Sequence, residues 1–402
     1  MIENKGLIAG AGIVGLACAY RIHKAYPNVS LTIVDKENEV AQHQTGHNSG
    51  VLHSGIYYPP NSQKAENCLN GKKAMEDFCE KEGISFDKCG KVIVAKNESE
   101  LSQLNKLLER GQSHGLDIQL IGPERLKELE PHVTGIKALH VKSAGIVDYK
   151  EVSQRLLNIL LESNRHQFIP NFKIEHLETT QNGIKVSSQN QSIQAKWAIN
   201  STGLYSDKTY RLSGHEPHYK IIPFRGEYYK LKEERKHLCK NLIYPVPDPS
   251  FPFLGVHLTR MISGEVECGP NAVLALGREG YDWGKINFPE LFECLTYSGF
   301  HKLAKKHFRA GLEEMKRSFF KSAFTHSLQE LVPEIEEHDL VKAPAGIRAQ
   351  ALEPTGKLMD DFHFVDAKPW LHLCNVPSPA ATSSLNIGKV ALDRLTNMGV
   401  FH

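Results

Sequence analysis

The chain opens with a stretch that decides much of its fold: residues 6–15 read Gly-Leu-Ile-Ala-Gly-Ala-Gly-Ile-Val-Gly. The apolar run Gly6 to Ala9 precedes the glycine turn, and a helical pattern follows as far as Ala25. A second apolar run, Val29 to Val34, ends at Asp35. Strand, glycine turn, helix and strand within about 30 residues form the βαβ unit of a Rossmann-type dinucleotide-binding fold.

The three glycines match the spacing that a dinucleotide requires. Gly10 permits the tight turn, Gly12 lets main-chain amides approach a pyrophosphate, and Gly15 lets the helix pack against the strand. Asp35 ends the second strand, where a carboxylate accepts hydrogen bonds from ribose hydroxyls. The pattern predicts a dinucleotide site but does not distinguish FAD from NAD.

Composition limits the class of protein. The 402 residues are 41% hydrophobic and 23% charged, so the chain can bury a large core over roughly two domains. The formal net charge of +2 lacks the basic excess that nucleic-acid binding needs. The eight cysteines show neither zinc-knuckle nor redox-dithiol spacing, so we expect reduced, mostly buried thiols and no metal site. We expect no nucleic-acid partner.

The sequence gives no sign of targeting or of a membrane span. The first residues are too short and glycine-rich for the apolar part of a signal peptide. No stretch approaches the ~20 apolar residues that cross a bilayer. We expect a cytoplasmic protein, and peripheral attachment at the inner membrane face stays open because it leaves no mark in a sequence.

Further along the chain, four sequence segments distinguish between FAD and NAD as the cofactor. They are Thr45-Gly46-His47-Asn48-Ser49-Gly50-Val51-Leu52-His53-Ser54-Gly55-Ile56-Tyr57-Tyr58, Pro223-Phe224-Arg225-Gly226-Glu227-Tyr228-Tyr229, Gly255-Val256-His257-Leu258-Thr259-Arg260 and Ser378-Pro379-Ala380-Ala381-Thr382-Ser383-Ser384. The first resembles the flavin-facing loop of the D-amino-acid-oxidase-like FAD oxidoreductases. Together the segments are similar to the L-2-hydroxyglutarate dehydrogenase/oxidase family, from about residue 6 to 395. Two features are less typical of that family: Lys5 and Gly6 leave the first strand short, and Asp35 stands where many relatives carry Glu.

The resemblance implies the fold and the cofactor. It implies an α/β protein with a Rossmann-type FAD-binding domain made of residues 1–90, 146–215 and 340–402. A mixed-sheet substrate domain is inserted, made of residues 91–145 and 216–339. Between Pro217 and Pro333 the sequence favours short strands separated by prolines, and Ser384 to Leu395 favours a C-terminal helix.

The resemblance also implies which residues hold FAD. Ser383 or Thr382 is expected to cap the last helix, so that its exposed amides meet the pyrimidine edge of the flavin. His47 could tether the flavin covalently, although a loop-shaping role is favoured. The full set of expected FAD contacts is Gly10, Gly12, Ile13, Val14, Gly15, Asp35, Lys36, Thr45, Ser49, Gly50, Val51, Leu52, Thr202, Gly203, Gly346, Ala380, Ala381, Thr382 and Ser383.

Oxidation of a 2-hydroxy acid needs a hydride acceptor, a base for the hydroxyl proton and cations for the carboxylate. A histidine suits the base because its ordinary pKa near 6.5 leaves it neutral near working pH. His53 and His257 are the candidates, and His257 is slightly favoured because it comes from the expected substrate domain. For binding the substrate carboxylates and hydroxyl we expect Arg225, Arg348, Tyr58, Tyr244 and, as a weaker third cation, Arg260.

The sequence therefore predicts FAD-dependent oxidation of L-2-hydroxyglutarate to 2-oxoglutarate, and the small-molecule partner is this hydroxy diacid. Two alternatives stay open: an amino-acid or amine oxidase on the same scaffold, and a dinucleotide-binding sensor without turnover. No motif marks the electron acceptor, which could be oxygen, a quinone or a carrier protein.

Overall fold

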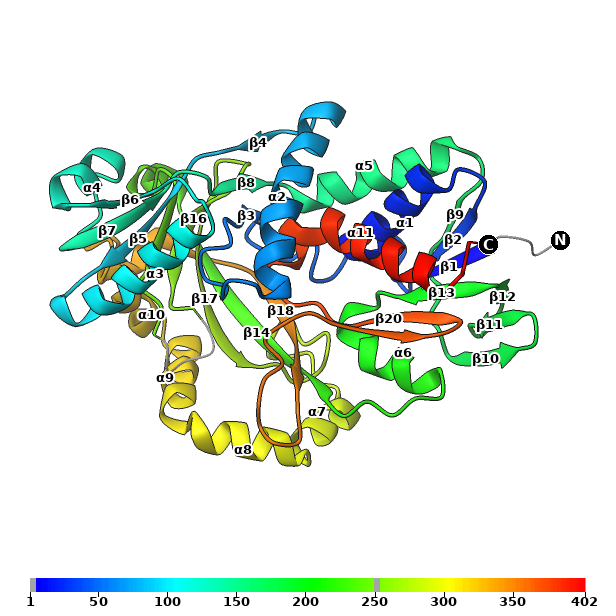
Figure 1. The fold of residues 1–402 in the computed structure, drawn as a ribbon. Coiled ribbons are helices and arrows are strands. Elements are labelled where there is room, and N and C mark those ends of the chain that lie inside the picture. Colours follow the sequence, from blue (N-terminus) through cyan, green and yellow to red (C-terminus); the bar gives the residue numbers. More distant parts are fainter. Residues whose placement is uncertain (1–4, 249–253, 402) are drawn as a thin grey trace.

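The computed structural model describes residues 5–248 and 254–401, and its first layer is a six-stranded sheet (Figure 1). The strand order is β19-β20-β13-β1-β2-β9, parallel throughout except at the edge strand β19. The glycine turn lies between β1 and α1, as the sequence predicts. The bounds are β1 (Lys5–Ala9), β2 (Ser30–Val34), β9 (Gln167–Ile169), β13 (Trp197–Asn200), β19 (His363–Ala367), β20 (Trp370–Asn375) and α1 (Ile13–Ala25).

Helices cover one face of this sheet and a small meander covers the other. On the helical side α1 contacts both α5 and α11, and α11 also contacts α2 (Figure 1). Apolar residues of β1 and β2 pack on the opposite side against the meander β10-β11-β12. The bounds are α2 (Gln63–Glu82), α5 (Tyr149–Glu162), α11 (Ala380–Asn397), β10 (His176–Thr180), β11 (Gly183–Ser187) and β12 (Ser192–Ala195).

A mixed eight-stranded sheet forms the second part of the molecule, in the order β18-β14-β17-β16-β15-β5-β7-β6. Its two longest strands, β14 and β18, form an antiparallel pair at one edge, with Arg225 opposite Ile347 and Phe224 opposite Arg348. The bounds are β5 (Lys91–Ala95), β6 (Ile118–Ile121), β7 (Lys137–Val141), β14 (Lys220–Leu231), β15 (Leu242–Pro245), β16 (His257–Arg260), β17 (Val266–Leu274) and β18 (Leu340–Leu352).

The eight-stranded sheet differs in one strand from the expected division of the chain into two domains. Residues 91–145 and 216–339 supply seven strands of the eight-stranded sheet, as expected, but its edge strand β18 lies beyond residue 339. The division into two domains itself stays a prediction. Further elements are β3 (Val51–Leu52), β8 (Gly145–Val147), β4 (Phe86–Asp87), α3 (Leu101–Ser113), α4 (Pro123–Leu129) and α6 (Ser206–Leu212).

The stretch from Pro217 to Pro333 is not made only of short strands. Four helices follow β17: α7 (Phe288–Leu295), α8 (Ser298–Lys306), α9 (Phe308–Phe319) and α10 (Lys321–Gln329). The strand expectation was wrong here because Phe288, Phe292 and Leu295 recur at helical spacing, and the prolines lie before or at the start of the helices.

The cysteines and the helices bear on two further expectations. All eight cysteines are unpaired thiols, and seven of them are buried, which agrees with the reduced state expected from the sequence. Among the described residues, no helix combines the length and apolar character needed to cross a bilayer.

Candidate active site

One cavity of about 1270 Å³ joins the two parts of the molecule. Its walls include the glycine turn after β1, the loop 44–58, the start of α11 and strands β14, β16 and β18 of the eight-stranded sheet. The residues predicted for the dinucleotide and those predicted for the substrate therefore largely meet in one space. A cavity of this size accommodates both a dinucleotide and a small acid.

The glycine turn has the geometry that a pyrophosphate needs. Gly10 has a φ of +104°, and a Cβ there would lie 2.5 Å from Ser201 O. A Cβ at Gly15 would lie 2.1 Å from Gly10 O, so only glycine allows α1 to pack this closely. At Gly12, by contrast, the only atom within 4 Å is Thr45 Oγ1, at 3.2 Å, so the space beside the helix start is open.

The acidic residue after β2 is held by main-chain amides. Asp35 Oδ2 accepts a hydrogen bond from Ala11 N at 2.7 Å, and Oδ1 accepts one from Glu37 N at 3.0 Å. The carboxylate lines the cavity, and its contact with a ribose stays a prediction. Lys36, the neighbouring expected contact, lines the cavity as well.

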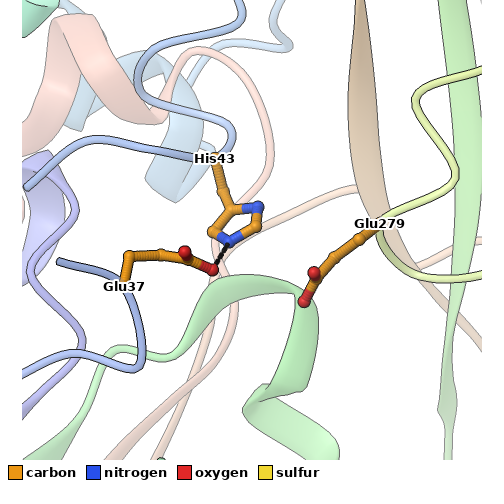
Figure 2. A group of neighbouring side chains, drawn as sticks. All are labelled: Glu37, His43 and Glu279. Atoms are coloured by element: carbon orange, nitrogen blue, oxygen red, sulfur yellow. Dashed lines mark hydrogen bonds and ion pairs between the residues drawn. The ribbon is translucent and has the colours of Figure 1, made fainter. Parts of the chain in front are cut away.

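Three side chains beside Lys36 resemble a metal-binding group but are already neutralised. Figure 2 shows that Glu37, His43 and Glu279 converge. The ammonium of Lys36 lies among them, paired with Glu37, 2.8 Å from Glu279 Oε1 and 2.9 Å from His43 Nε2. Because a lysine holds the central position, we interpret this group as an ion-pair cluster at the cavity wall.

The start of α11 is tied to the flavin-facing loop rather than capped by its own side chains. Pro379 is the N-cap residue and makes no side-chain cap bond, so the expected capping by Thr382 or Ser383 was wrong. Thr382 Oγ1 instead donates to Val51 O at 3.1 Å and accepts from His53 N at 3.1 Å. The first turn of α11 thus leaves its amides unused by side chains, with Ala380, Ala381 and Thr382 lining the cavity.

Most of the other expected FAD contacts also line the cavity: Ile13, Val14, Thr45, Ser49, Val51, Thr202, Gly203 and Gly346. Among the described residues that line it, Gly15, Gly50, Leu52 and Ser383 are absent. Leu52 lies in the hydrophobic core, and Ser383 packs so closely against α2 that a Cβ on Gly71 would lie 2.5 Å from Ser383 Cα. These residues lie behind those that line the cavity and support them.

His47 is held by a main-chain contact within its own loop and by an aromatic contact outside it. Its Nδ1 donates to His43 O at 3.0 Å, and its ring stacks on Tyr281 with the centroids 4.5 Å apart. These contacts support the loop-shaping role over a covalent tether.

Both candidate histidines line the cavity, and the geometry of His257 suits a base. Its Nδ1 lies 2.8 Å from Gly255 O, and a carbonyl can only accept, so Nδ1 carries the hydrogen. The lone pair of a neutral ring then lies on Nε2. The imidazole also stacks on Tyr244, with the ring centroids 3.9 Å apart, which fixes its orientation.

Burial and nearby cations keep both histidines neutral. Desolvation lowers the pKa of His257 to about 3, and the positive charges of Arg348 and Lys91 add to this effect. Desolvation likewise lowers the pKa of His53 to about 3, with Lys91, His257 and Arg348 contributing. A neutral imidazole is the form that accepts a proton.

Arg348 is the predicted arginine that reaches the cavity. It extends from β18 and lines the wall together with Tyr58, Tyr228 and Tyr244. The guanidinium donates a hydrogen bond to the hydroxyl oxygen of Tyr228, and desolvation raises the pKa of Tyr228 to about 12 although the positive charge of Arg348 lowers it. Tyr58 and Tyr244 keep their protons because burial raises the pKa of each hydroxyl, so both can act as donors.

The other two arginines lie elsewhere, and assigning them to the substrate was wrong. Arg225 is fully buried on the opposite face of β14. Its Nη2 and Nε lie 2.9 and 3.1 Å from Glu227 Oε1, and its guanidinium lies 4.2 Å from the centroid of Trp283. Arg260 pairs with Asp87 at the far end of β16. Neither is among the described residues that line the cavity.

Two lysines of the site were not predicted from the sequence. Lys64 lines the cavity beside Asp360, close enough to Arg348 for the two charges to interact, and its pKa is lowered chiefly by desolvation. Lys91 is buried behind the cavity wall, 4.4 Å from the ring centroid of Tyr57 and 4.8 Å from that of Tyr244. Desolvation lowers the pKa of Lys91 to about 7. A lysine at the start of the otherwise apolar strand Lys91–Ala95 was the available signal for Lys91.

Comparisons with known proteins identify relatives of this chain. The family model described as FAD dependent oxidoreductase matches residues 6–394. The L-2-hydroxyglutarate dehydrogenase of Indibacter alkaliphilus is 49% identical, with 95% of this chain and 96% of that protein covered. The L-2-hydroxyglutarate dehydrogenase of Escherichia coli K12 is 43% identical (95% and 90% covered), and the human mitochondrial enzyme of that name is 40% identical (97% and 88% covered).

Solved structures agree on the fold. The FAD-bound L-alpha-glycerophosphate oxidase of Mycoplasma pneumoniae superposes with a TM-score of 0.80 at 23% identity, covering 98% of this chain and 94% of that one. Glycine oxidase from Geobacillus kaustophilus gives a TM-score of 0.74 at 12% identity, covering 98% and 95%. The chain therefore belongs to the family of FAD-dependent oxidoreductases that includes the L-2-hydroxyglutarate dehydrogenases.

Proposed function

We propose that this protein oxidises L-2-hydroxyglutarate to 2-oxoglutarate with FAD as its cofactor. The proposal rests on one observation: three parts of the site line the same cavity. They are the open glycine turn at Gly12, the neutral imidazole of His257, and the cations Arg348 and Lys64. The names of the relatives support this substrate, since proteins 40% to 49% identical over 95% to 97% of this chain are L-2-hydroxyglutarate dehydrogenases.

The cofactor fits the residues present. Gly12 leaves room for a pyrophosphate, the first turns of α1 and α11 offer amides, and the hydroxyl of Tyr57 is buried at the cavity wall with no partner among the described residues. When bound, FAD supplies the acceptor for the hydride that leaves the α-carbon of the substrate. The chain's own residues bind the acid, orient it and take the hydroxyl proton.

His257 is the proposed base. With Nδ1 donating to Gly255 O, Nε2 accepts the proton of the 2-hydroxyl as the carbonyl of the product forms. His53 lies in the same cavity and is the alternative base, but its main chain also shapes the flavin-facing loop through Thr382. We therefore assign His53 to shaping that loop.

Two cations match the two carboxylates of the substrate. The guanidinium of Arg348 offers the paired donors that hold a carboxylate in one plane, and Tyr58 and Tyr244 donate from the same wall. Lys64 supplies a second positive charge for the distal carboxylate. A monocarboxylic substrate such as lactate or glycine would engage only one of these two cations.

The test is anaerobic flavin reduction, followed by its visible absorbance after rapid mixing with substrate. L-2-hydroxyglutarate should bleach the flavin faster than the D enantiomer, lactate, glycine or sarcosine. Faster reduction by glycine or sarcosine would assign the protein to the amine oxidases, and no reduction by any of these acids would favour the sensor. Adding oxygen or a water-soluble quinone to the reduced enzyme then identifies which class of acceptor takes the electrons.

A further inference from the structure

The loop that connects β17 to α7, residues 275–287, also reaches the nucleotide end of the cavity. A hydrogen bond from Asn287 N to Leu276 O at 2.8 Å closes the loop at its base. Within the loop, Glu279 lines the cavity beside Lys36, one of the FAD contacts expected from the sequence. The sequence predicted no cofactor contact in this loop, so its role is inferred from the contacts that it makes.

The carboxylate of Glu279 joins two segments that belong to the six-stranded sheet. Its Oε1 lies 2.8 Å from Nζ of Lys36, which follows β2, and accepts a hydrogen bond from the hydroxyl of Tyr205 at 2.5 Å. Tyr205 ends the short 3-10 helix η2 (Gly203–Tyr205), which follows β13. Strands β2 and β13 are the two neighbours of β1 in the sheet. One carboxylate oxygen therefore bridges the segments on either side of the glycine turn.

Tyr281 makes a second contact with the segment that follows β2. Its hydroxyl lies 3.0 Å from Nδ1 of His43, and its ring stacks on that of His47. Figure 2 shows how Glu279 approaches His43 from a different part of the chain. Residues 36–47 are thus held at both ends by the loop of the other sheet.

Two buried guanidinium groups fix this loop in place. Arg278 donates to the two carboxylate oxygens of Asp207, on α6, at 2.6 and 2.9 Å. Arg225 donates from Nη1 to Gly280 O at 3.3 Å. These anchors lie on the residues directly before and after Glu279, so its side chain is presented from a rigid support. Arg225, which does not reach the cavity, supports this loop from behind.

Lys36 and Glu279 are both charged at neutral pH. Partial burial raises the pKa of Glu279, but hydrogen bonds from Lys36 and Tyr205 outweigh this effect and lower that pKa below its ordinary value. Partial burial lowers the pKa of Lys36, and the hydrogen bonds to Glu279 and Glu37 more than compensate and raise it. The contact between the two side chains is therefore an ion pair.

We propose that Glu279 and Tyr281 are positioning residues for the cofactor, which hold residues 36–47, and Lys36 above all, against the nucleotide end of FAD. A dinucleotide at the glycine turn lies outside the carboxyl end of its strand, in the groove that the Glu279 bridge crosses. By holding Lys36 beside Asp35, the bridge keeps this wall of the groove in place and slows the release of FAD. The proposal rests on FAD binding at the turn and not on the substrate.

FAD release from the holoenzyme tests the proposal. Serial dilution of the holoenzyme, followed by the rise in flavin fluorescence as FAD leaves, gives both the Kd and the release rate. Glu279→Gln keeps the shape of the side chain and an acceptor for Tyr205 but removes the charge, so both quantities should rise about 3- to 10-fold. Tyr281→Phe removes only the contact with His43 and should raise both about 2- to 10-fold.

A second ion pair provides a matched control. Glu265 Oε2 lies 2.8 Å from Lys230 Nζ, and the two side chains are 43% and 28% exposed, against 38% and 24% for Glu279 and Lys36. Neither Glu265 nor Lys230 is among the described residues that line the cavity. Glu265→Gln should therefore leave the Kd and the release rate unchanged. Added salt should speed FAD release more in the wild type than in Glu279→Gln, because salt screens the ion pair.

Lys36→Met separates positioning from a general effect on the fold. If Glu279 acts through Lys36, adding Glu279→Gln to Lys36→Met should change the Kd by no more than about twofold. Two results would overturn the proposal: a wild-type Kd and release rate in both Glu279→Gln and Tyr281→Phe, or full additivity of Glu279→Gln and Lys36→Met. Gly12→Ala, diluted in the same way, reports on the turn alone and so distinguishes a failure of the bridge from a failure of the FAD site.

Discussion

Replacing Gly12 or Gly15 of the turn by alanine should affect the protein in two different ways. At Gly12 the new Cβ meets only Thr45 Oγ1, at 3.2 Å, which a small side-chain movement can relieve. At Gly15 it would lie 2.1 Å from Gly10 O and 2.5 Å from Ser201 Oγ, so helix α1 must move away from β1. The first change affects the cofactor, and the second affects the fold.

The magnitudes follow from these contacts. Gly12→Ala should lower the free energy of unfolding of the apoprotein by up to about 1 kcal/mol, because alanine is a poorer N-cap. If the Cβ removes one charge-assisted hydrogen bond to the pyrophosphate, roughly 1.5–3 kcal/mol is lost, and the Kd for FAD rises about 10- to 150-fold. Gly15→Ala overpacks the core and should lower the unfolding free energy by about 3 kcal/mol.

Two measurements check this pair. Urea unfolding of both apoproteins gives the stability change, and titration with FAD, followed by quenching of flavin fluorescence, gives the Kd. Unchanged FAD affinity in a well-folded Gly12→Ala variant would refute the reading of the turn as a pyrophosphate site. Equal stability of Gly15→Ala and wild type would show that the helix and strand are less tightly packed than the structure indicates.

Three further predictions concern the substrate end of the cavity. His257→Ala should slow flavin reduction by about 10²-fold or more in rapid mixing while FAD stays bound, and a near-normal rate would transfer the role of base to His53. Arg348→Lys should raise the apparent Kd for substrate more than it slows reduction, whereas Arg225→Lys should lower the urea midpoint and leave that Kd unchanged. Because the pKa of His257 is about 3 in the folded protein and 6.5 is its ordinary value, the base stays unprotonated down to about pH 4. As the pH falls, His257 is protonated in the unfolded chain before it is protonated in the folded protein. The free energy of unfolding that the neutral histidine contributes is therefore complete above pH 6.5 and is lost as the pH falls toward 3. A urea midpoint that does not fall between pH 7.5 and pH 5 would contradict this.

The nucleotide end of the site could be predicted because its requirements are local. The roles of Gly10, Gly12 and Gly15 depend on residues a few positions away, and the strand and helix patterns on either side confirm the turn. The neighbours that make Gly10 and Gly15 obligatory, however, include Ser201 at the end of β13. Sequence spacing alone does not reveal that contact.

The helices between residues 288 and 329 were missed for a different reason. Their apolar residues recur at helical spacing, which is readable, but the prolines of the preceding stretch favoured strands. Even a correct helix prediction would have placed Phe308 and Leu312 in the core, because an apolar stripe normally faces inward. The buried carboxylate of Glu314 reverses this orientation, and that depends on a tertiary contact to Ala272.

Arg225 and Arg348 offer the same chemistry for binding a carboxylate, and the pairing of their strands decides which of them reaches the cavity. Both Arg225 and Arg348 lie in strands among apolar and small residues, so composition favours them equally. In the antiparallel pair β14–β18, Arg225 stands opposite Ile347, and residues directly opposite one another project from the same face. Arg348 follows Ile347 and must project from the other face, because successive side chains alternate. Once this register is known, the two arginines cannot serve the same carboxylate. Arg348 faces the cavity with Gly226, Tyr228 and Gly346, and Arg225 is left to neutralise Glu227 behind the sheet.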